Sequence, residues 1–325
     1  MTTAYARKNQ ILFLLAVTLL LFALCSYHID FFFTKNNFQN IIESLSYRMI
    51  LAIGMTFVIA SGAMDLSVGS LFSLAGIASA LALKSGFTVG TSIVFAIFVS
   101  ISVGCINGLI IDLTKINFFI ITLASSAVLR GIALIVTQGK PITGFSQAFL
   151  QIGIGRILGI QIPVWIMFFI LAMSVVLLNI TKWGSYVLSI GGNEEALRKV
   201  GVPVLPYKMS VFAFMGFCCA LSALIMTARL NSAEPNAGMG MELEAITAVI
   251  MGGSRINGGS AGIAGTALAI FILSIIRNAL TLLGISSDYQ HLITGILLFV
   301  SVLISSPNVY KAKALYKKIT RRKNA

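Results

Sequence analysis

The chain has very little charge for its length. Lys, Arg, Asp and Glu together make up 10% of its 325 residues, whereas an average soluble protein has roughly a quarter. Hydrophobic residues make up 58%, and the mean hydropathy is +0.96. Charge this sparse excludes a water-soluble enzyme, a nucleic-acid-binding module and a disordered protein, and indicates a protein embedded in lipid.

Side chains that bind metals or carry out catalysis are scarce as well. The chain has two histidines, His28 and His291, and four cysteines that lie inside apolar stretches without metal-ligand spacing. It contains no G-x-x-x-x-G-K-[ST] phosphate loop, no H-E-x-x-H zinc helix and no G-x-S-x-G nucleophile elbow. We therefore expect a chain that is not an enzyme, binds no cofactor or metal and lacks an ATPase motif of its own.

The apolar residues form separate runs that predict an all-α integral membrane protein. At about 20 residues per membrane-spanning helix, they suffice for about ten helices. The runs lie near 11–29, 47–63, 66–83, 87–111, 118–137, 162–181, 208–229, 243–254, 262–284 and 289–306. The second and third runs are hardly separated and the eighth is short, so some helices are expected to be short or broken. We expect one transmembrane domain over residues 1–310.

The positions of the basic residues predict the orientation in the membrane. Lys and Arg accumulate in cytoplasmic loops, and here they cluster at Arg7 and Lys8, in the loop 182–208 and in a tail, 311–325, that carries seven of the 23 basic residues. Ten spans with both termini in the cytoplasm place all three clusters inside, and loops 30–46, 138–161 and 230–242 outside. The net charge of +13 then suits contact with membrane lipid, and no nucleic-acid partner is expected.

Two stretches rich in glycine and small polar residues, 62–70 and 252–262, interrupt the apolar runs. Unpaired backbone groups are costly in lipid, so such breaks persist where protein buries them or where they line a water-filled cavity. Transporters use broken helices in this way at substrate sites and gates. Close spacing of Gly and Ser also permits tight helix packing, and that alternative stays open.

The breaks and the small polar groups on the spans supply the candidates for a translocation path or gate. They are Asp65, Ser67, Gly69, Ser70, Asn107, Thr122, Gly252, Gly253, Asn257, Gly258, Gly259 and Asn278. Two arginines, Arg130 and Arg277, lie within or near spans, where a charge is costly. We expect each of them to pair, to snorkel or to face an aqueous path.

The inside loop 182–208 has the pattern of a short capped helix. Asn193 is a good N-cap, Glu194 and Glu195 follow in the first turn, and Arg198 and Lys199 come in the last, so each charge suits the helix dipole. Such a helix at the membrane's inner face either fits a groove on a partner protein or lies on lipid.

Four sequence blocks, taken in order, resemble the permease subunits of ribose-type, high-affinity monosaccharide ABC importers. They are 54–59 with 65–70; 119–123 with 130–134; 190–196; and 242–243 with the glycine pairs at 252–253 and 258–259. The resemblance covers residues 47–306. One departure is Asn117, which stands close to where the family tends to have a proline.

The resemblance implies a multi-pass protein of the bacterial inner (plasma) membrane. It implies a second permease copy, with a homodimer expected and a heterodimer possible, cytoplasmic ATPase subunits that use ATP, and an extracytoplasmic sugar-binding protein. It also implies that the inside loop couples the chain to the ATPase. The coupling residues are then Gly192, Asn193, Glu194, Glu195, Ala196 and Arg198.

The sequence therefore predicts a permease that imports a monosaccharide or a similar small polyol and is driven by a separate ATPase subunit. The main alternative is a self-sufficient secondary carrier in which Asp65 binds a coupling ion. A membrane-embedded enzyme is a more distant third, because the chain lacks clustered nucleophiles or bases.

Overall fold

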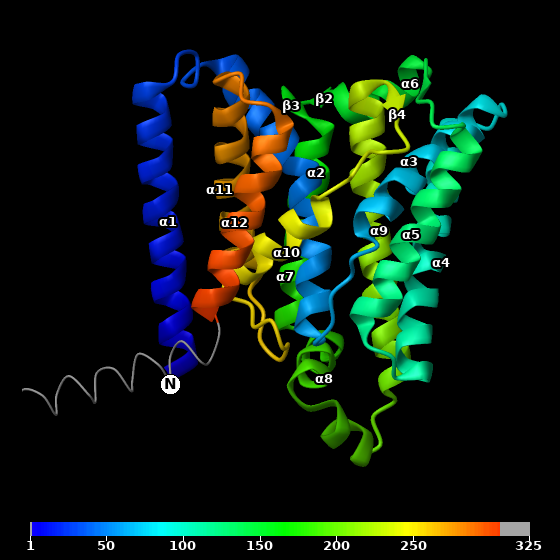
Figure 1. The fold of residues 1–325 in the computed structure, drawn as a ribbon, viewed down its shortest axis with the longest axis vertical. Coiled ribbons are helices and arrows are strands. Elements are labelled where there is room, and N and C mark those ends of the chain that lie inside the picture. The colour runs from blue at the N-terminus through cyan, green and yellow to red at the C-terminus, as the bar shows by residue number, and fades with distance from the viewer. Residues whose placement is uncertain (1, 306–325) are drawn as a thin grey trace, which may run out of the picture.

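A computed structural model describes residues 2–305, which fold into twelve α-helices and four very short strands (Figure 1). The elements are α1 (Thr2–His28), α2 (Lys35–Ala60), α3 (Val68–Lys84), α4 (Val89–Thr114), α5 (Phe118–Thr137), β1 (Ile142–Thr143), α6 (Gln147–Ile154), β2 (Arg156–Ile157), β3 (Ile160–Gln161), α7 (Ile162–Asn179), α8 (Lys182–Lys199), α9 (Val204–Leu230), β4 (Ser232–Ala233), α10 (Met241–Met251), α11 (Ile263–Leu282) and α12 (Ser287–Ser305). The expected basic tail, 311–325, lies outside the described residues.

Each of the ten apolar runs falls on a helix. Seven helices in the described part are long and apolar enough to cross a membrane: α1, α2, α4, α5, α7, α9 and α11. The short eighth run is α10, which has 11 residues. The second and third runs are α2 and α3, separated by a non-helical break at 61–67.

The start of α2 corrects the sequence-based boundary. Residues 30–46 were expected to form an outside loop, but the helix begins at Lys35, and the Oγ1 of Thr34 accepts a hydrogen bond from the amide of Asn37 (3.3 Å). Polar residues in the first two turns of α2 lower the local hydropathy. Hydropathy therefore marks only the apolar part of this helix and misses its polar beginning.

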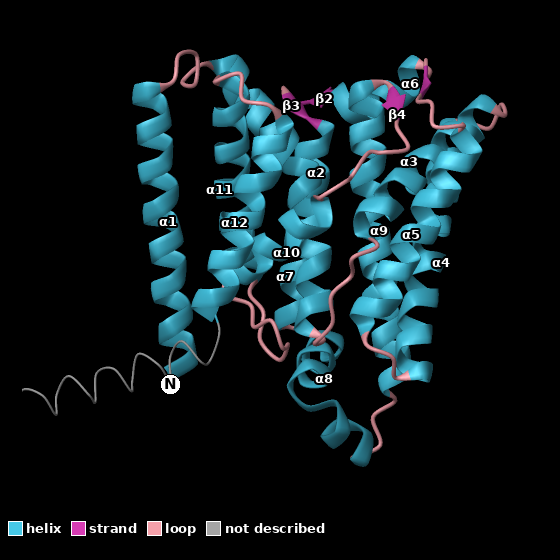
Figure 2. Cartoon of the chain, viewed as in Figure 1, coloured by secondary structure: helices cyan, strands magenta, loops and turns pink. Residues whose placement is uncertain are grey.

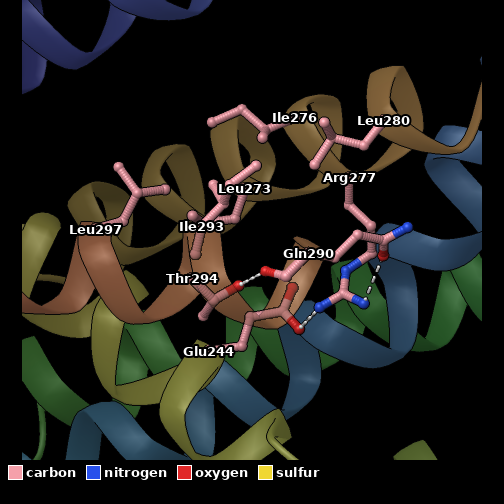
Figure 3. A pocket seen from close by; sticks show the side chains of 9 residues that line it. All are labelled: Glu244, Leu273, Ile276, Arg277, Leu280, Gln290, Ile293, Thr294 and Leu297. Atoms are coloured by element: carbon pink, nitrogen blue, oxygen red, sulfur yellow. Dashed lines mark hydrogen bonds and ion pairs between the residues drawn. The ribbon is translucent and has the colours of Figure 1, made fainter. Parts of the chain in front are cut away.

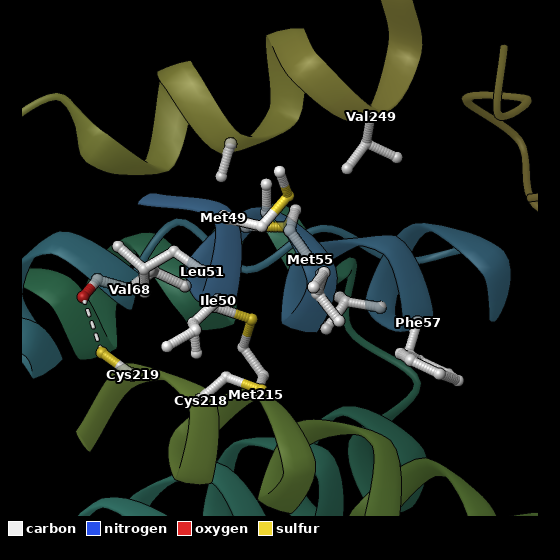
Figure 4. Packing of buried hydrophobic residues seen from close by; sticks show 14 of the residues in the cluster. Met49, Ile50, Leu51, Met55, Phe57, Val68, Met215, Cys218, Cys219 and Val249 are labelled. Atoms are coloured by element: carbon white, nitrogen blue, oxygen red, sulfur yellow. Dashed lines mark hydrogen bonds between the residues drawn. The ribbon is translucent and has the colours of Figure 1, made fainter. Parts of the chain in front are cut away.

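Helix α2 is the centre of the molecule. Every residue from 45 to 60 is buried, as expected for a helix that is apolar on all sides. Figure 4 shows Ile50 on the side that faces Met215 and Cys218 of α9, with Val249 of α10 on the opposite side. The more exposed α1, α4 and α5 surround this core.

The two ends of the molecule differ. The beginning of α1, the whole of α8 and the end of α12 lie at one end, and α6 with the short strands lies at the other (Figures 1 and 2). Two antiparallel pairs, β1 with β4 and β2 with β3, stabilise the connections there. The expected loop 138–161 is thus largely structured, and the expected loop 182–208 is mostly the helix α8.

Candidate functional site

The break between α2 and α3 is organised by Asp65. Its Oδ1 accepts hydrogen bonds from the amide (2.8 Å) and the hydroxyl (2.5 Å) of Ser67, just before α3 begins. The Asp65 residue is 1% exposed, and its Oδ2 has no hydrogen-bond partner among the described residues. The amide of Asn107 on α4 donates to the Ser67 hydroxyl (3.1 Å). A buried carboxylate with one oxygen unsatisfied therefore lies at the start of α3.

Helix α5 brings further polar groups to the same break. The hydroxyl of Thr122 lies 3.5 Å from the carbonyl oxygen of Met64, and the hydroxyls of Ser126 and Ser70 are 2.9 Å apart. Five of the residues proposed from sequence are thus brought together around one break. They are Asp65, Ser67, Ser70, Asn107 and Thr122.

A second non-helical segment, 234–240, consists largely of turns and leads into α10. Figure 2 shows it running from the end of the molecule that holds β4 to mid-height, so the expectation that 230–242 is an outside loop is wrong for its second half. The guanidinium of Arg130 on α5 donates to the carbonyls of Pro235 and Ala237 (3.1 Å to the latter). The hydroxyl of Ser73 on α3 donates to the Pro235 carbonyl as well (2.8 Å). These donors satisfy backbone carbonyl groups that a non-helical segment would otherwise leave unpaired inside the helix bundle.

The first turns of α3 and α10 lie side by side. Each turn comes directly after the non-helical segment that precedes its helix. A Cβ on Gly69 would collide with the carbonyl oxygen of Gly238, and one on Gly238 would lie 2.5 Å from the carbonyl oxygen of Gly69. The backbones therefore cross where only glycine fits. Each helix N-terminus carries roughly half a positive charge, and the carboxylates of Asp65 and Glu242 lie beside these two ends. The two half-length helices then run toward opposite ends of the molecule (Figure 1).

The predicted break at 252–262 is a non-helical connection between α10 and α11, and its glycines divide into two groups. Gly258 and Gly259 lie against the first break, and the amide of Gly259 donates to the carbonyl of Ala60 (3.0 Å). Gly252 packs against the backbone of α11, and Gly253 packs against a side chain of α1. Gly252 and Gly253 therefore lie against neighbouring helices and not against the first break.

Two other predicted path residues lie at different places. The carbonyl oxygen of Asn257 faces Gly62 in the first break. The side chain of Asn278 on α11 exchanges two hydrogen bonds with that of Asn37 on α2 (2.8 and 3.0 Å). Asn278 therefore joins helices and is not part of the Asp65 cluster.

An ion network holds α10 to its neighbours, and sequence reasoning missed two of its members. The carboxylate of Glu244 contacts the guanidinium groups of Arg48 on α2 (2.7 Å) and Arg277 on α11 (3.0 Å). Arg277 also donates to Gln290 on α12 (3.1 Å), and Figure 3 shows Glu244, Arg277 and Gln290 converging beside apolar side chains. Of the three alternatives expected for Arg277, which were pairing, snorkelling and facing an aqueous path, the structure shows pairing. Arg48 and Glu244 are each the second residue of an apolar run, 47–63 and 243–254, and their opposite charges were the available signal.

The predicted capped helix is the second half of α8. Asn193 has extended backbone angles (φ −161°, ψ 90°) inside α8, and its Oδ1 accepts a hydrogen bond from the amide of Ala196 (2.9 Å). The cap is therefore confirmed, and it produces a kink. The first half of α8, from Lys182 to Gly192, is helical as well, which sequence reasoning did not anticipate.

The charges on the second half of α8 point in two directions. Glu194 bonds to Lys208 of α9 (2.6 Å), and Arg198 bonds to Asp112 of α4 and to Glu194 (2.8 Å). Glu195 and Lys199 pair with each other (2.7 Å), and their side chains are 78% and 73% exposed. Glu194 and Arg198 therefore hold α8 to the helix bundle, whereas Glu195 and Lys199 remain accessible.

These contacts set the ionisation of Glu194. Partial burial opposes its ionisation, but hydrogen bonds from Lys208 and Arg198 outweigh that effect and hold the pKa of the carboxyl below its ordinary value. The hydrogen bond to Glu194 in turn raises the pKa of Arg198. Both groups are charged at neutral pH, so the contact between α8 and the bundle is ionic.

The described residues contain no group of three or more His, Cys, Asp and Glu side chains placed to hold a metal ion. They combine long apolar helices, two non-helical segments that enter the bundle and a kinked helix at one end. Non-helical backbone inside an apolar helix bundle is typical of membrane transport proteins. The fold and the site thus define a multi-pass membrane transport protein.

Comparison with protein families specifies that class. Residues 37–302 match the family described as branched-chain amino acid transport system / permease component. The chain belongs to this family and is a transport permease of the bacterial inner (plasma) membrane. The predicted recognition as a transport permease subunit and the predicted localisation are both confirmed.

Several characterised permeases are similar to the chain along most of its length. The ribose import permease protein RbsC of Haemophilus influenzae is 41% identical over 276 residues, which are 84% of this chain and 85% of that protein. RbsC of Escherichia coli K12 is 38% identical over 90% of this chain and 92% of its own. The L-arabinose transport system permease protein AraH of Escherichia coli K12 is 33% identical over 93% of this chain and 91% of its own. No solved structure matches the chain.

Proposed function

We propose that the chain is the permease subunit of a binding-protein-dependent ABC importer for a monosaccharide or a similar small polyol. Support comes from its similarity to permeases named for ribose and arabinose. The observation that carries the proposal is α8, a kinked helix at one end of the molecule with accessible charges at its tip. ATP is hydrolysed on a separate cytoplasmic subunit, and this chain binds no cofactor.

The proposed topology has ten spans in one domain, 1–310, with both termini in the cytoplasm and the tail 311–325 beyond it. It is supported by Figure 1, in which the beginning of α1, the whole of α8 and the end of α12 share one end. Helices α3 and α10 are shorter than a full span. Each is therefore counted, together with the non-helical segment that precedes it, as one span. Basic residues concentrated in α8 and the terminal segments favour the cytoplasm for that end.

The proposed translocation path passes the crossing of α3 and α10. The groups there are the free oxygen of Asp65, the hydroxyls of Ser67, Ser70 and Thr122 and the amide of Asn107. Such groups exchange hydrogen bonds with a hydroxylated solute. Tight binding there would slow release, so affinity is assigned to an extracytoplasmic sugar-binding protein. A second permease copy, identical or different, completes the assembly.

We assign three roles to the predicted coupling residues. Gly192, Asn193 and Ala196 form the kink and its cap, and Glu194 and Arg198 anchor α8 to the bundle. Glu195, with its neighbour Lys199, is the part left to contact an ATPase. The proposed ATPase contact therefore comprises fewer residues than the predicted set of coupling residues.

Co-purification in mild detergent tests this proposal with two matched charge reversals. Glu195→Lys changes the accessible tip of α8, and Lys140→Glu changes an exposed position beside β1, at the other end of the molecule. We expect the wild type and Lys140→Glu to recover an ATP-hydrolysing subunit and Glu195→Lys to recover much less. Equal recovery by both variants would contradict the assignment of this surface, and no recovery by the wild type would contradict the ABC proposal itself.

Membership of this permease family does not favour the alternative hypothesis of a secondary carrier. That hypothesis can be tested directly, because it requires Asp65 to bind the coupling ion. An ion-coupled carrier would lose ion coupling in Asp65→Asn and would transport without ATP. An ATP-driven permease shows no dependence of uptake on an ion gradient in either form. Uptake measured with and without the gradient separates the two.

A further inference from the structure

Three segments that are distant in the sequence meet at one point beneath the end of α2. A Cβ on Gly191 of α8 would collide with the carbonyl oxygen of Ala60, and it would lie 2.5 Å from the amide of Gly259 and 2.9 Å from that of Gly62. The amide of Gly259 itself donates to the Ala60 carbonyl (3.0 Å). The backbone of α8 is therefore in direct contact with the hydrogen bond that joins the other two segments.

Both of these segments belong to breaks in the helices. Gly62, with φ 83°, is in the break that leads to α3, and Gly258 and Gly259, with φ 80° and 74°, are in the connection from α10 to α11. A Cβ on Gly258 would lie 2.6 Å from the Cα of Gly62 and 2.8 Å from that of Gly191. With no side chain between the three backbones, a shift of one must displace the others.

Helix α8 is built to transmit a displacement to this point. The first half is fixed to the bundle by Trp183, whose indole N–H donates to Ser210 (2.8 Å) and whose ring lies 5.2 Å from that of Phe57. Val187 and Ile190 on the same half are fully or nearly fully buried. The accessible tip lies just beyond the kink at Asn193. Three residues, 192–194, separate Glu195 at the tip from Gly191, so a push at the tip is transmitted to Gly191 across the kink.

We propose that Gly191 is a positioning residue through which movement of α8 displaces both breaks together. The proposal rests on the proposed function, because the push comes from the ATPase subunit. In this proposal, the contact of the Gly191 backbone with the two breaks transmits ATP-driven motion of α8 to the translocation path. In this arrangement the inner ends of α2 and of the α10–α11 connection move as a unit.

A glycine in another helix provides a matched control. A Cβ on Gly191 meets three backbone atoms, whereas a Cβ on Gly131 of α5 meets no described atom within 4 Å. Neither glycine has a positive φ, so Gly191→Ala and Gly131→Ala bring the same gain in helix propensity. A difference between these two variants then reports the three-segment contact.

The experiment compares both variants with the wild type in the complete transporter, reconstituted with its co-purified ATPase. We expect Gly191→Ala to keep the ATPase and its basal hydrolysis while uptake per ATP falls by about fivefold or more, the lower end of typical coupling between sites. Gly131→Ala should match the wild type in both. Equal uptake by the two variants overturns the proposal. Failure of the wild type to recruit an ATPase overturns the proposed function, and this proposal with it.

A second measurement needs no variant and holds if Gly191→Ala fails to assemble. Amide hydrogen exchange of the wild-type complex is compared with and without a non-hydrolysable ATP analogue. We expect exchange in α8 to change together with that of the amides of Gly62 and Gly259. A change in α8 alone would overturn the proposal.

Discussion

Replacing Glu244 with glutamine removes the carboxylate that contacts both Arg48 and Arg277. Glu244 is 3% exposed and lies 2.7 Å from Arg48 and 3.0 Å from Arg277. Breaking a buried ion pair by removing one partner costs about 3–5 kcal/mol, because the remaining charge stays buried without compensation. Arg277 is partly exposed and recovers some hydration, so we expect a value near the lower limit.

Thermal unfolding of the purified chain in one detergent measures this loss, with Glu195→Gln as the control. Glu195 forms an exposed pair with Lys199, and such pairs contribute about 0–1 kcal/mol. We expect a clearly lower melting temperature for Glu244→Gln and no resolved change for Glu195→Gln. Equal melting temperatures would refute the conclusion that the Glu244 network holds α10 in place.

Three further changes have expected outcomes. Arg130→Met removes charge-assisted hydrogen bonds to the 234–240 segment, each contributing about 1.5–3 kcal/mol, so limited proteolysis should cut that segment faster, while Arg130→Lys should be intermediate. Asn193→Ala removes the cap inside α8 at a cost of about 1 kcal/mol, which lower protection of the Ala196 amide in hydrogen exchange would reveal. Because the pKa of Glu194 is held below its ordinary value, its stabilisation is present at pH 7 and is lost as the pH falls through that lowered pKa. The melting temperatures of the wild type and Glu194→Gln should therefore differ at pH 7 and converge in acid.

The apolar runs were sufficient to predict ten of the twelve described helices, because hydrophobic length is the dominant requirement for a helix in lipid. They did not predict α6 or the first half of α8, which lie outside the runs. Where a helix begins with polar residues, as α2 does at Lys35, hydropathy placed the boundary too late. The cap at Asn193 was predictable, because a cap is formed by residues within a few positions of each other.

Contacts between distant segments were not predictable from local patterns. The glycine stretches indicated breaks, but not that Gly69 crosses Gly238, because each glycine alone fits helix packing equally well. The sequence of segment 234–240 is typical of a surface loop. Its position inside the bundle depends on hydrogen bonds to its carbonyls from Arg130 and Ser73, which lie far away in the sequence. The same holds for Glu244, whose partners lie 196 and 33 residues away along the chain.

The most direct test of the account is uptake of labelled monosaccharides, tested one by one, into proteoliposomes that contain the chain, its co-purified ATPase and an added sugar-binding protein. The account predicts uptake that requires ATP hydrolysis and stops when Glu195→Lys prevents recruitment of the ATPase. Uptake by the chain alone, driven by an ion gradient without ATP and abolished by Asp65→Asn, would contradict it.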